Sequence, residues 1–176
     1  MRHESRHRFV LPQFDSVSQN AAVVNSQQRC DSIMTGIFPP TGEQDKHRAR
    51  LLKSDERQYL LFCLEFCGQI LERRPNHLEA LELAANHYTE MGYFNDGLEL
   101  DRRLAALRPN DPGVLYNLSC SLALTGSVQD ALDCLSLAVA KGYRDYKHMS
   151  TDRDLAPLRS QPRFGELLAM VAREGA

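Results

Sequence analysis

Cysteine, histidine and aspartate are the residues of this chain whose types and spacing could do chemistry. Cys63 and Cys67 lie one helical turn apart and could share a metal ion. Cys120 could act as a nucleophile, because a thiol becomes catalytic when a base lies beside it and a third group orients that base. His87 is the candidate base, since it is expected on the neighbouring helix.

Each of these patterns falls short of what its chemistry needs. Cys63 and Cys67 occupy helix positions where small apolar residues are expected, and free cysteine behaves as a small hydrophobe. The segment STDRD, with Asp152 and Asp154, lacks the spacing and the glycine of a calcium loop, so helix capping explains it better. No phosphate-binding glycine loop or serine elbow occurs. We predict no enzyme activity, no metal and no cofactor, and keep catalysis by Cys120 as an alternative.

Composition places the chain among ordinary globular proteins. Its 176 residues are 43% hydrophobic and 25% charged, and the formal net charge is −2. That balance gives no general attraction to nucleic acid or to acidic membranes. No apolar run approaches the roughly 18 residues that span a bilayer, and the charged N-terminus lacks the apolar stretch of a signal peptide. We therefore expect a cytoplasmic protein with reduced cysteines and with neither a nucleic-acid nor a membrane partner.

The first part of the chain, residues 1–41, shows little periodicity. Its segments SVSQNAAVVNSQQ and IFPPTG are polar or rich in breakers, so we expect an extended or disordered arm. A short docking segment within residues 9–14 is an alternative. Three early arginines are compatible with an organelle transit peptide, but Glu4 and Asp15 argue against one.

The elements that must position these residues follow a repeat of about 34 residues, a length that is typical of stacked helical hairpins. Pro75 maps onto Pro109 and Gly92 maps onto Gly126 at that fixed interval. We therefore predict five regions: an arm over 1–41, a capping helix and half repeat over 42–75, full repeats over 76–109 and 110–143, and a C-terminal cap over 144–176.

Apolar residues at spacings of three and four predict the individual helices. Thr41 with Gln44 is a plausible capping box for a charged helix, and a second helix is expected from Ser54 to Pro75. Ser127 is a reasonable N-cap in the second full repeat. The last hairpin is expected to be covered by apolar residues of the C-terminal segment, namely Leu155, Leu158, Phe164, Leu167 and Leu168.

These positions resemble the tetratricopeptide repeat (TPR) family, which has a helix–turn–helix unit of this length. The matching core residues of the first full copy are Leu81, Ala84, Ala85, Tyr88, Gly97, Leu104 and Pro109. Those of the second are Leu115, Leu118, Ser119, Leu122, Ala131 and Ala138. The resemblance implies an all-α, TPR-like helical-hairpin array (an α-solenoid) with capping helices. Asp101 departs from the pattern, because the family usually has an apolar residue there, and we expect wetter or looser packing beneath it.

The resemblance also implies non-catalytic binding of a protein or peptide in a concave groove, as in an adaptor, co-chaperone or assembly factor. The groove positions carried onto this chain are Glu79, Glu82, Asn86 and Glu90 in one repeat and Tyr116, Asn117, Cys120 and Leu124 in the next. An acidic half and an apolar half would suit a ligand with a basic segment and an apolar anchor. Two alternatives stay open: the glutamates form only a solvated face, or the protein is a structural subunit of a homo- or hetero-oligomer that binds no free peptide.

Overall fold

The computed structural model describes residues 40–174, and every regular element in that part of the chain is a helix. The elements are α2 (Lys46–Leu51), α3 (Ser54–Arg73), α4 (Leu78–Glu90), α5 (Phe94–Leu107), α6 (Pro112–Leu124), α7 (Val128–Ala140), α8 (Tyr146–Thr151), a short 3-10 helix (Ala156–Leu158) and α9 (Pro162–Glu174). The all-α prediction is thus confirmed for these residues. The expected arm, the docking segment within it and Cys30 fall outside them, apart from the last two residues of the arm.

Two successive hairpins dominate the fold and repeat each other closely. α6 begins and ends one repeat interval after α4, and α7 begins one repeat interval after α5. Gly92 and Gly126 end the first helix of each hairpin with φ of 82° and 83°, a left-handed conformation that favours glycine. In both hairpins, the amide of the residue after the glycine donates a hydrogen bond to a carbonyl oxygen of the first helix. Tyr93 N–H donates to Tyr88 O, and Ser127 N–H donates to Leu122 O, as expected of a glycine C-cap.

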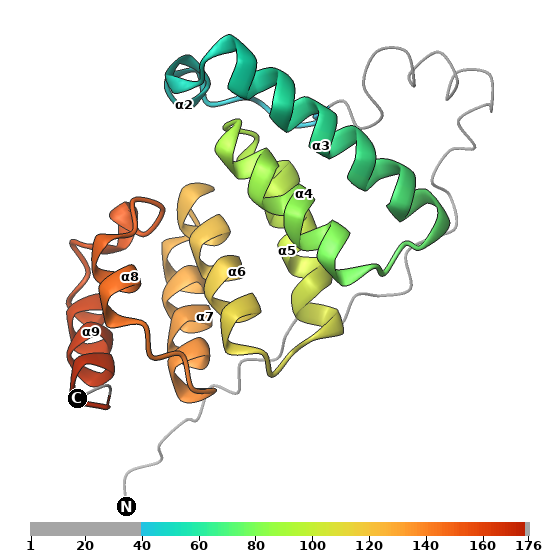
Figure 1. Ribbon diagram of the computed structural model, residues 1–176. Helices are drawn as coiled ribbons and strands as arrows, with labels where there is room; N and C mark the ends of the chain where they lie inside the picture. Colours follow the sequence, from blue (N-terminus) through green and yellow to red (C-terminus); the bar gives the residue numbers. More distant parts are fainter. Residues whose placement is uncertain (1–39, 175–176) are drawn as a thin grey trace, which may run out of the picture.

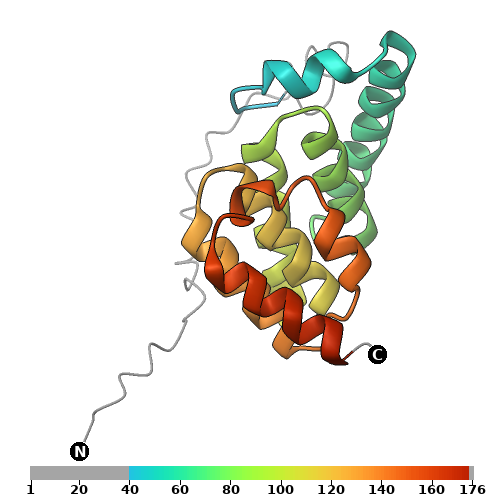
Figure 2. The ribbon, with the colours of Figure 1, turned by 90° about the vertical axis from the view of Figure 1, so that its left-hand side faces the viewer.

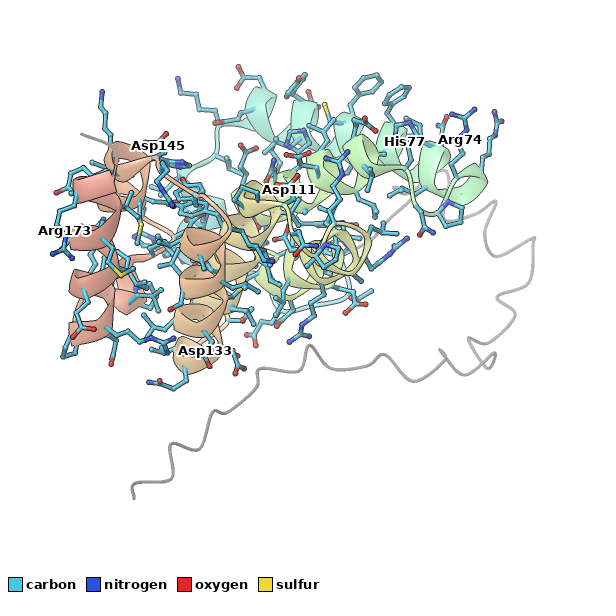
Figure 3. The ribbon with its side chains drawn as sticks, turned by 90° about the horizontal axis from the view of Figure 1, so that it is seen from below. Arg74, His77, Asp111, Asp133, Asp145 and Arg173 are labelled. Atoms are coloured by element: carbon cyan, nitrogen blue, oxygen red, sulfur yellow. The ribbon has the colours of Figure 1, made fainter. Side chains whose placement is uncertain are left out.

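The helices stack side by side in chain order from α3 to α9 (Figure 1). Arg74 and His77, in the turn between α3 and α4, lie towards one end of the molecule, and Arg173 of α9 lies at the other (Figure 3). The core runs along the stack, since Leu81 of α4, Leu115 of α6 and Leu135 of α7 are all fully buried.

Close approach of α4 and α5 depends on Gly97. A Cβ at this position would lie 2.7 Å from Thr89 Oγ1 and 3.2 Å from the carbonyl oxygen of Ala85. The absence of a side chain at this position therefore lets the two helices approach closely. At the same register of the next hairpin Ala131 is fully buried, whereas Cys63, at that register of α3, is only half-buried.

The predicted capping box of α2 is wrong. Asp45, not Thr41, caps α2 and accepts from the amides of His47 and Arg48. Thr41 instead donates to Asp96, and Gln44 donates to the carbonyl oxygen of Met91, so both residues hold the chain onto the α4–α5 turn. Ser127 is the N-cap residue of α7, as predicted, but its side chain makes no capping bond. The amide of Val128, at the start of α7, donates to the carbonyl oxygen of Gly126 instead.

The C-terminal segment covers the last hairpin, as Figure 2 shows from that end. Leu155, Leu158, Phe164 and Leu167 are buried and Leu168 packs against the core, which confirms the predicted covering contacts. Met149 of α8 and Val171 of α9 are fully buried as well. Within residues 40–174, no helix combines the length and the apolar character that a bilayer crossing needs.

Candidate functional site

A polar pocket of about 360 Å³ lies between two first helices of the hairpins and the C-terminal segment. α4 supplies Asn86, Thr89 and Glu90, and α6 supplies Tyr116, Asn117, Cys120 and Ser121. α8 and the segment that follows it supply His148, Asp152 and Asp154, while Arg48 comes from α2 and Asp101 from α5. We call this space the acidic pocket, because it holds four carboxyl groups against one guanidinium and one imidazole.

The acidic pocket gathers five of the eight predicted binding residues: Asn86, Glu90, Tyr116, Asn117 and Cys120. Glu79 and Glu82 are exposed on α4 but do not line it. Leu124 is half-buried and lines a neighbouring pocket instead. The predicted residues of α4 and α6 therefore converge only in part, because those near the start of α4 lie away from the C-terminal segment that closes the pocket.

Tyr116 differs from its predicted role as an open groove residue, because the structure buries it to 2% exposure. Its ring stacks on that of Tyr143 with centroids 4.2 Å apart and planes 4° apart. Its hydroxyl donates to Asp152 Oδ2 over 2.7 Å. Burial above all raises the pKa of this phenol, so it stays a neutral donor. Tyr116 thus anchors the C-terminal segment against α6 and offers a partner little free surface.

Cys120 is also buried, and its surroundings oppose thiolate chemistry. Its Sγ lies 3.6 Å from Asp152 Oδ2. Burial first, and then the negative charges of Asp152 and Asp154, raise the pKa of the thiol well above its usual value. A thiol becomes a nucleophile when its pKa is lowered by cationic neighbours, so this site works in the opposite direction.

His87 does not join Cys120 as a base. Its Nδ1 lies 3.2 Å from Glu90 Oε2, and its ring meets that of Tyr59 edge-on with centroids 6.4 Å apart. It is absent from the lining of the acidic pocket. The Cys63–Cys67 pair gathers no further ligand either, because the described residues contain no group of three side chains suited to a metal ion.

Arg48 closes one side of the acidic pocket. Its Nη1 donates to Asp154 Oδ1 over 2.7 Å, and its guanidinium lies 5.7 Å from the centre of the Phe94 ring. The turn before α2 is docked on the first hairpin, since Asp45 N–H donates to Gly92 O over 2.9 Å. α2 and the C-terminal segment thereby meet across the face that α4 and α6 line.

Asp101 forms part of the wall where α5 meets α6. It is 4% exposed and accepts a hydrogen bond from Ser121 Oγ. Burial, reinforced by the charge of Glu82, raises the pKa of this carboxyl to about 6, although the Ser121 bond acts in the opposite direction. Its neighbours Leu100, Leu104 and Ala105 are all buried, while Asp101 itself lines the acidic pocket, so the expectation of wetter or looser packing stays a prediction.

A second pocket of about 550 Å³ shares Arg48 and Glu90 with the first. Its apolar wall consists of Leu51, Leu52, Phe94, Leu124 and Pro157. The rest of its lining is charged or polar, namely Asp45, His47, Arg48, Glu56, Glu90 and Arg153. We call it the apolar pocket after the wall that the first pocket lacks. Leu51 is 67% exposed, so this wall is open to a ligand.

Sequence reasoning missed the residues that come from outside the repeats. Arg48 lies in the charged first helix, and His148 lies in the irregular segment after the last hairpin. Asp152 and Asp154 were noticed only as capping residues. Asp152 does cap locally, by accepting from Asp154 N–H, but it also receives the Tyr116 hydroxyl from α6. The repeat period cannot predict these residues, because they lie outside the two full repeats and have no counterpart in them.

Comparison with known proteins gives a partial similarity. No family model matches the chain. Over 103 residues the chain is 28% identical to a protein of Arabidopsis thaliana that is described as chloroplastic, an overlap of 57% of this chain and 29% of that protein. The chain therefore spans less than a third of the length of this relative.

Proposed function

We propose that this chain is a TPR-like helical-hairpin array that binds a protein or peptide partner without catalysing a reaction. The observation that carries the proposal is a pair of adjacent pockets that share Arg48 and Glu90, one lined mainly by α4, α6 and the C-terminal segment and the other mainly by α2 and the residue before it. The equal spacing of the two hairpins and the glycine turn that each contains support the assignment of the repeat.

The chemistry of the two pockets suggests a partner with a basic segment beside an apolar side chain. Lysine or arginine suits the acidic pocket, because the carboxyl groups of its lining outnumber the basic residues there, Arg48 and His148. The apolar anchor suits the apolar pocket beside it. The partner's apolar side chain is therefore expected in the apolar pocket and not at Tyr116 and Cys120, which are buried. The residues that would receive it are Leu51, Phe94 and Leu124.

Binding rather than catalysis is favoured by the state of the polar groups. The Cys120 thiol has a raised pKa, and the Tyr116 hydroxyl is engaged with Asp152. A general acid or base is most effective when its pKa lies near the working pH. Asp101 meets that condition, but its oxygen accepts from Ser121 and its side chain is buried.

The test is a peptide selection followed by titration. A random peptide library is selected on the wild-type protein, and the recovered peptides are titrated by fluorescence anisotropy. The variant Asn86→Ala/Glu90→Lys changes the acidic pocket, and Glu99→Lys, on an exposed position of α5 outside both pockets, is the matched control.

We expect the selected peptides to be basic with a large apolar residue, and to lose affinity at high salt. The pocket variant should bind roughly tenfold or more weakly, which corresponds to about 1.4 kcal/mol, while the control binds like wild type. Equal binding by the pocket variant and the control would overturn this site. Selection of peptides without basic residues would overturn the proposed ligand class.

A further inference from the structure

The outer face of α3 carries a stripe of exposed aromatic side chains. Tyr59, Phe62 and Phe66 are 63%, 66% and 55% exposed. Their spacing of three and four residues places them on one side of the helix. α3 lies at one end of the stack, with α4 along one of its sides (Figure 1). Large apolar groups gathered on one exposed face mark an interaction surface.

The repeat shows what kind of element such a face receives. Phe66 and Ile70 of α3 correspond, one repeat interval on, to Leu100 and Leu104 of α5. Leu100 and Leu104 are 9% and 2% exposed, and the neighbouring Gly97 sits against α4 in the same hairpin. In α7 the corresponding residues, Cys134 and Ala138, are also buried, in the hairpin formed with α6. The positions of Phe66 and Ile70 are therefore covered by an antiparallel helix in both complete hairpins, whereas the position of Phe62 holds Asp96 and Asp130, which are not buried.

α3 has no such partner in the described part of the chain. The helix before it, α2, has six residues, and none of them is buried. Its residues contact the α4–α5 turn and Asp154 rather than the aromatic stripe. Within residues 40–174, no first helix therefore covers this face of α3.

We propose that this face pairs with the same face of a second copy of this chain, α3 against α3 in antiparallel orientation. The charges at the ends of the stripe support a second copy. Asp55 and Arg73 are both exposed, and they share one side of the helix because five turns separate them. At 3.6 residues per turn, that side is also the side of the aromatic residues. Asp55 precedes the stripe and Arg73 follows it, about 27 Å away along the helix.

The positions are symmetric about one point of the helix. The midpoint between Asp55 and Arg73 coincides with the midpoint between Phe62 and Phe66. In an antiparallel pair with its two-fold axis at that point, each Phe62 packs on Phe66 of the other copy, and each Asp55 faces Arg73 of the other copy. A two-fold interface requires this kind of self-complementarity.

The size of the stripe sets the expected strength of the dimer. An aromatic side chain buries about 150–250 Å² when it is fully covered, so three that are already partly covered offer less than the roughly 800 Å² per partner of a standard interface. We therefore expect a reversible dimer with a dissociation constant in the micromolar range, about 1–100 μM. This surface is separate from both pockets, so its test does not depend on the proposed function.

The experiment is sedimentation equilibrium of the full chain over a concentration series. Phe62→Glu/Phe66→Glu should remove the dimer while the helical circular dichroism is retained. Leu107→Glu, which adds one glutamate at another exposed apolar position, on α5, should dimerise like wild type. A wild-type protein that is monomeric at several hundred micromolar would overturn the proposal, whether the stripe is covered by residues 1–39 or by another protein.

Charge reversal tests the antiparallel register. Asp55→Arg places two arginines opposite each other, and Arg73→Glu places two acids opposite each other. Each single variant should weaken the dimer, by roughly three- to thirtyfold for two exposed ion pairs. The double variant Asp55→Arg/Arg73→Glu should restore it. A double variant as weak as the single variants would overturn the register, and a dimer that survives Phe62→Glu/Phe66→Glu would overturn the surface.

Discussion

Arg48 and Asp154 form an ion pair across 106 residues of chain, with 2.7 Å between Nη1 and Oδ1. Both side chains are largely covered, at 30% and 20% exposure. The pair joins the helix that precedes the repeats to the segment that follows them. Because Arg48 lines both pockets, the contact also fixes the wall between the acidic and the apolar pocket.

Breaking this ion pair should loosen both ends of the array. Arg48→Ala and Asp154→Asn should each lower the free energy of unfolding by about 1 kcal/mol, near the upper end for pairs that solvent reaches. A double-mutant cycle from urea denaturation should give a coupling energy between them. The Arg163–Asp133 pair is the control, because both of its side chains are more than 40% exposed. Its double-mutant cycle should give a smaller coupling energy. A cycle without coupling at Arg48–Asp154 would show that the ends are held by packing alone.

Cys120 should be unreactive in the folded protein. Burial and the adjacent Asp152 raise the pKa of its thiol, and only the thiolate is alkylated rapidly. Among the four cysteines of residues 40–174, Cys63 is half-buried and the others are buried, so Cys63 should react before those three. Brief iodoacetamide treatment at neutral pH, followed by peptide mass mapping, measures the order. Rapid and selective labelling of Cys120 would restore the alternative in which this residue is a nucleophile.

The helices could be predicted from the sequence because the same spacing of apolar residues occurs in both full repeats. The glycine turns at Gly92 and Gly126 and the start of α3 at Ser54 follow from local rules, and the structure has them at those residues. Burial of Tyr116 could not be predicted in this way. It depends on Tyr143 and Asp152, which a segment outside the repeat brings onto α6.

The same limit explains the partial success with the candidate site. The groove positions that the resemblance implies include Asn86 of α4 and Asn117 of α6, and both line the acidic pocket. The resemblance gave no information on Arg48 or His148, whose positions depend on how the two ends of the chain fold over that wall. The hydrogen bond between Asp101 and Ser121 was missed for a related reason, because each residue breaks the apolar pattern alone and they satisfy each other only as a pair.

Gly97 should not tolerate a side chain, although it lies in a helix where alanine is usually better. Gly97→Ala would place a Cβ 3.2 Å from the Ala85 carbonyl oxygen and nearer still to Thr89 Oγ1, so the Thr89 side chain must move and α4 must give way slightly. We expect a loss of about 1–3 kcal/mol, typical of overpacking. Gly165→Ala in α9 is the matched control, because nothing lies within 4 Å of its Cβ, and it should gain up to about 1 kcal/mol. Equal effects in thermal or urea unfolding would contradict the close approach of α4 and α5.

Asp101 should make the stability of the protein depend on pH between about 4 and 6. The pKa of this carboxyl is about 6 in the folded state and near its ordinary value of 3.8 in the unfolded chain, mainly because of burial. The folded state therefore binds the proton more tightly, and this contribution to stability is full below pH 4 and is lost as the pH rises through 6. The change is about 3 kcal/mol.

The variant Asp101→Asn isolates that contribution, since an amide oxygen still accepts from Ser121 and carries no charge. Its free energy of unfolding should exceed that of wild type above pH 6 and approach it near pH 4, because there the wild-type carboxyl is already neutral in the folded protein. The difference between the two proteins removes the effect of the other carboxyl groups, including Glu82, whose charge also raises this pKa. Urea denaturation at several pH values gives the curve. A difference that does not change with pH would mean that Asp101 is ionised in the folded protein throughout this range, and that Ser121 and local water compensate its burial.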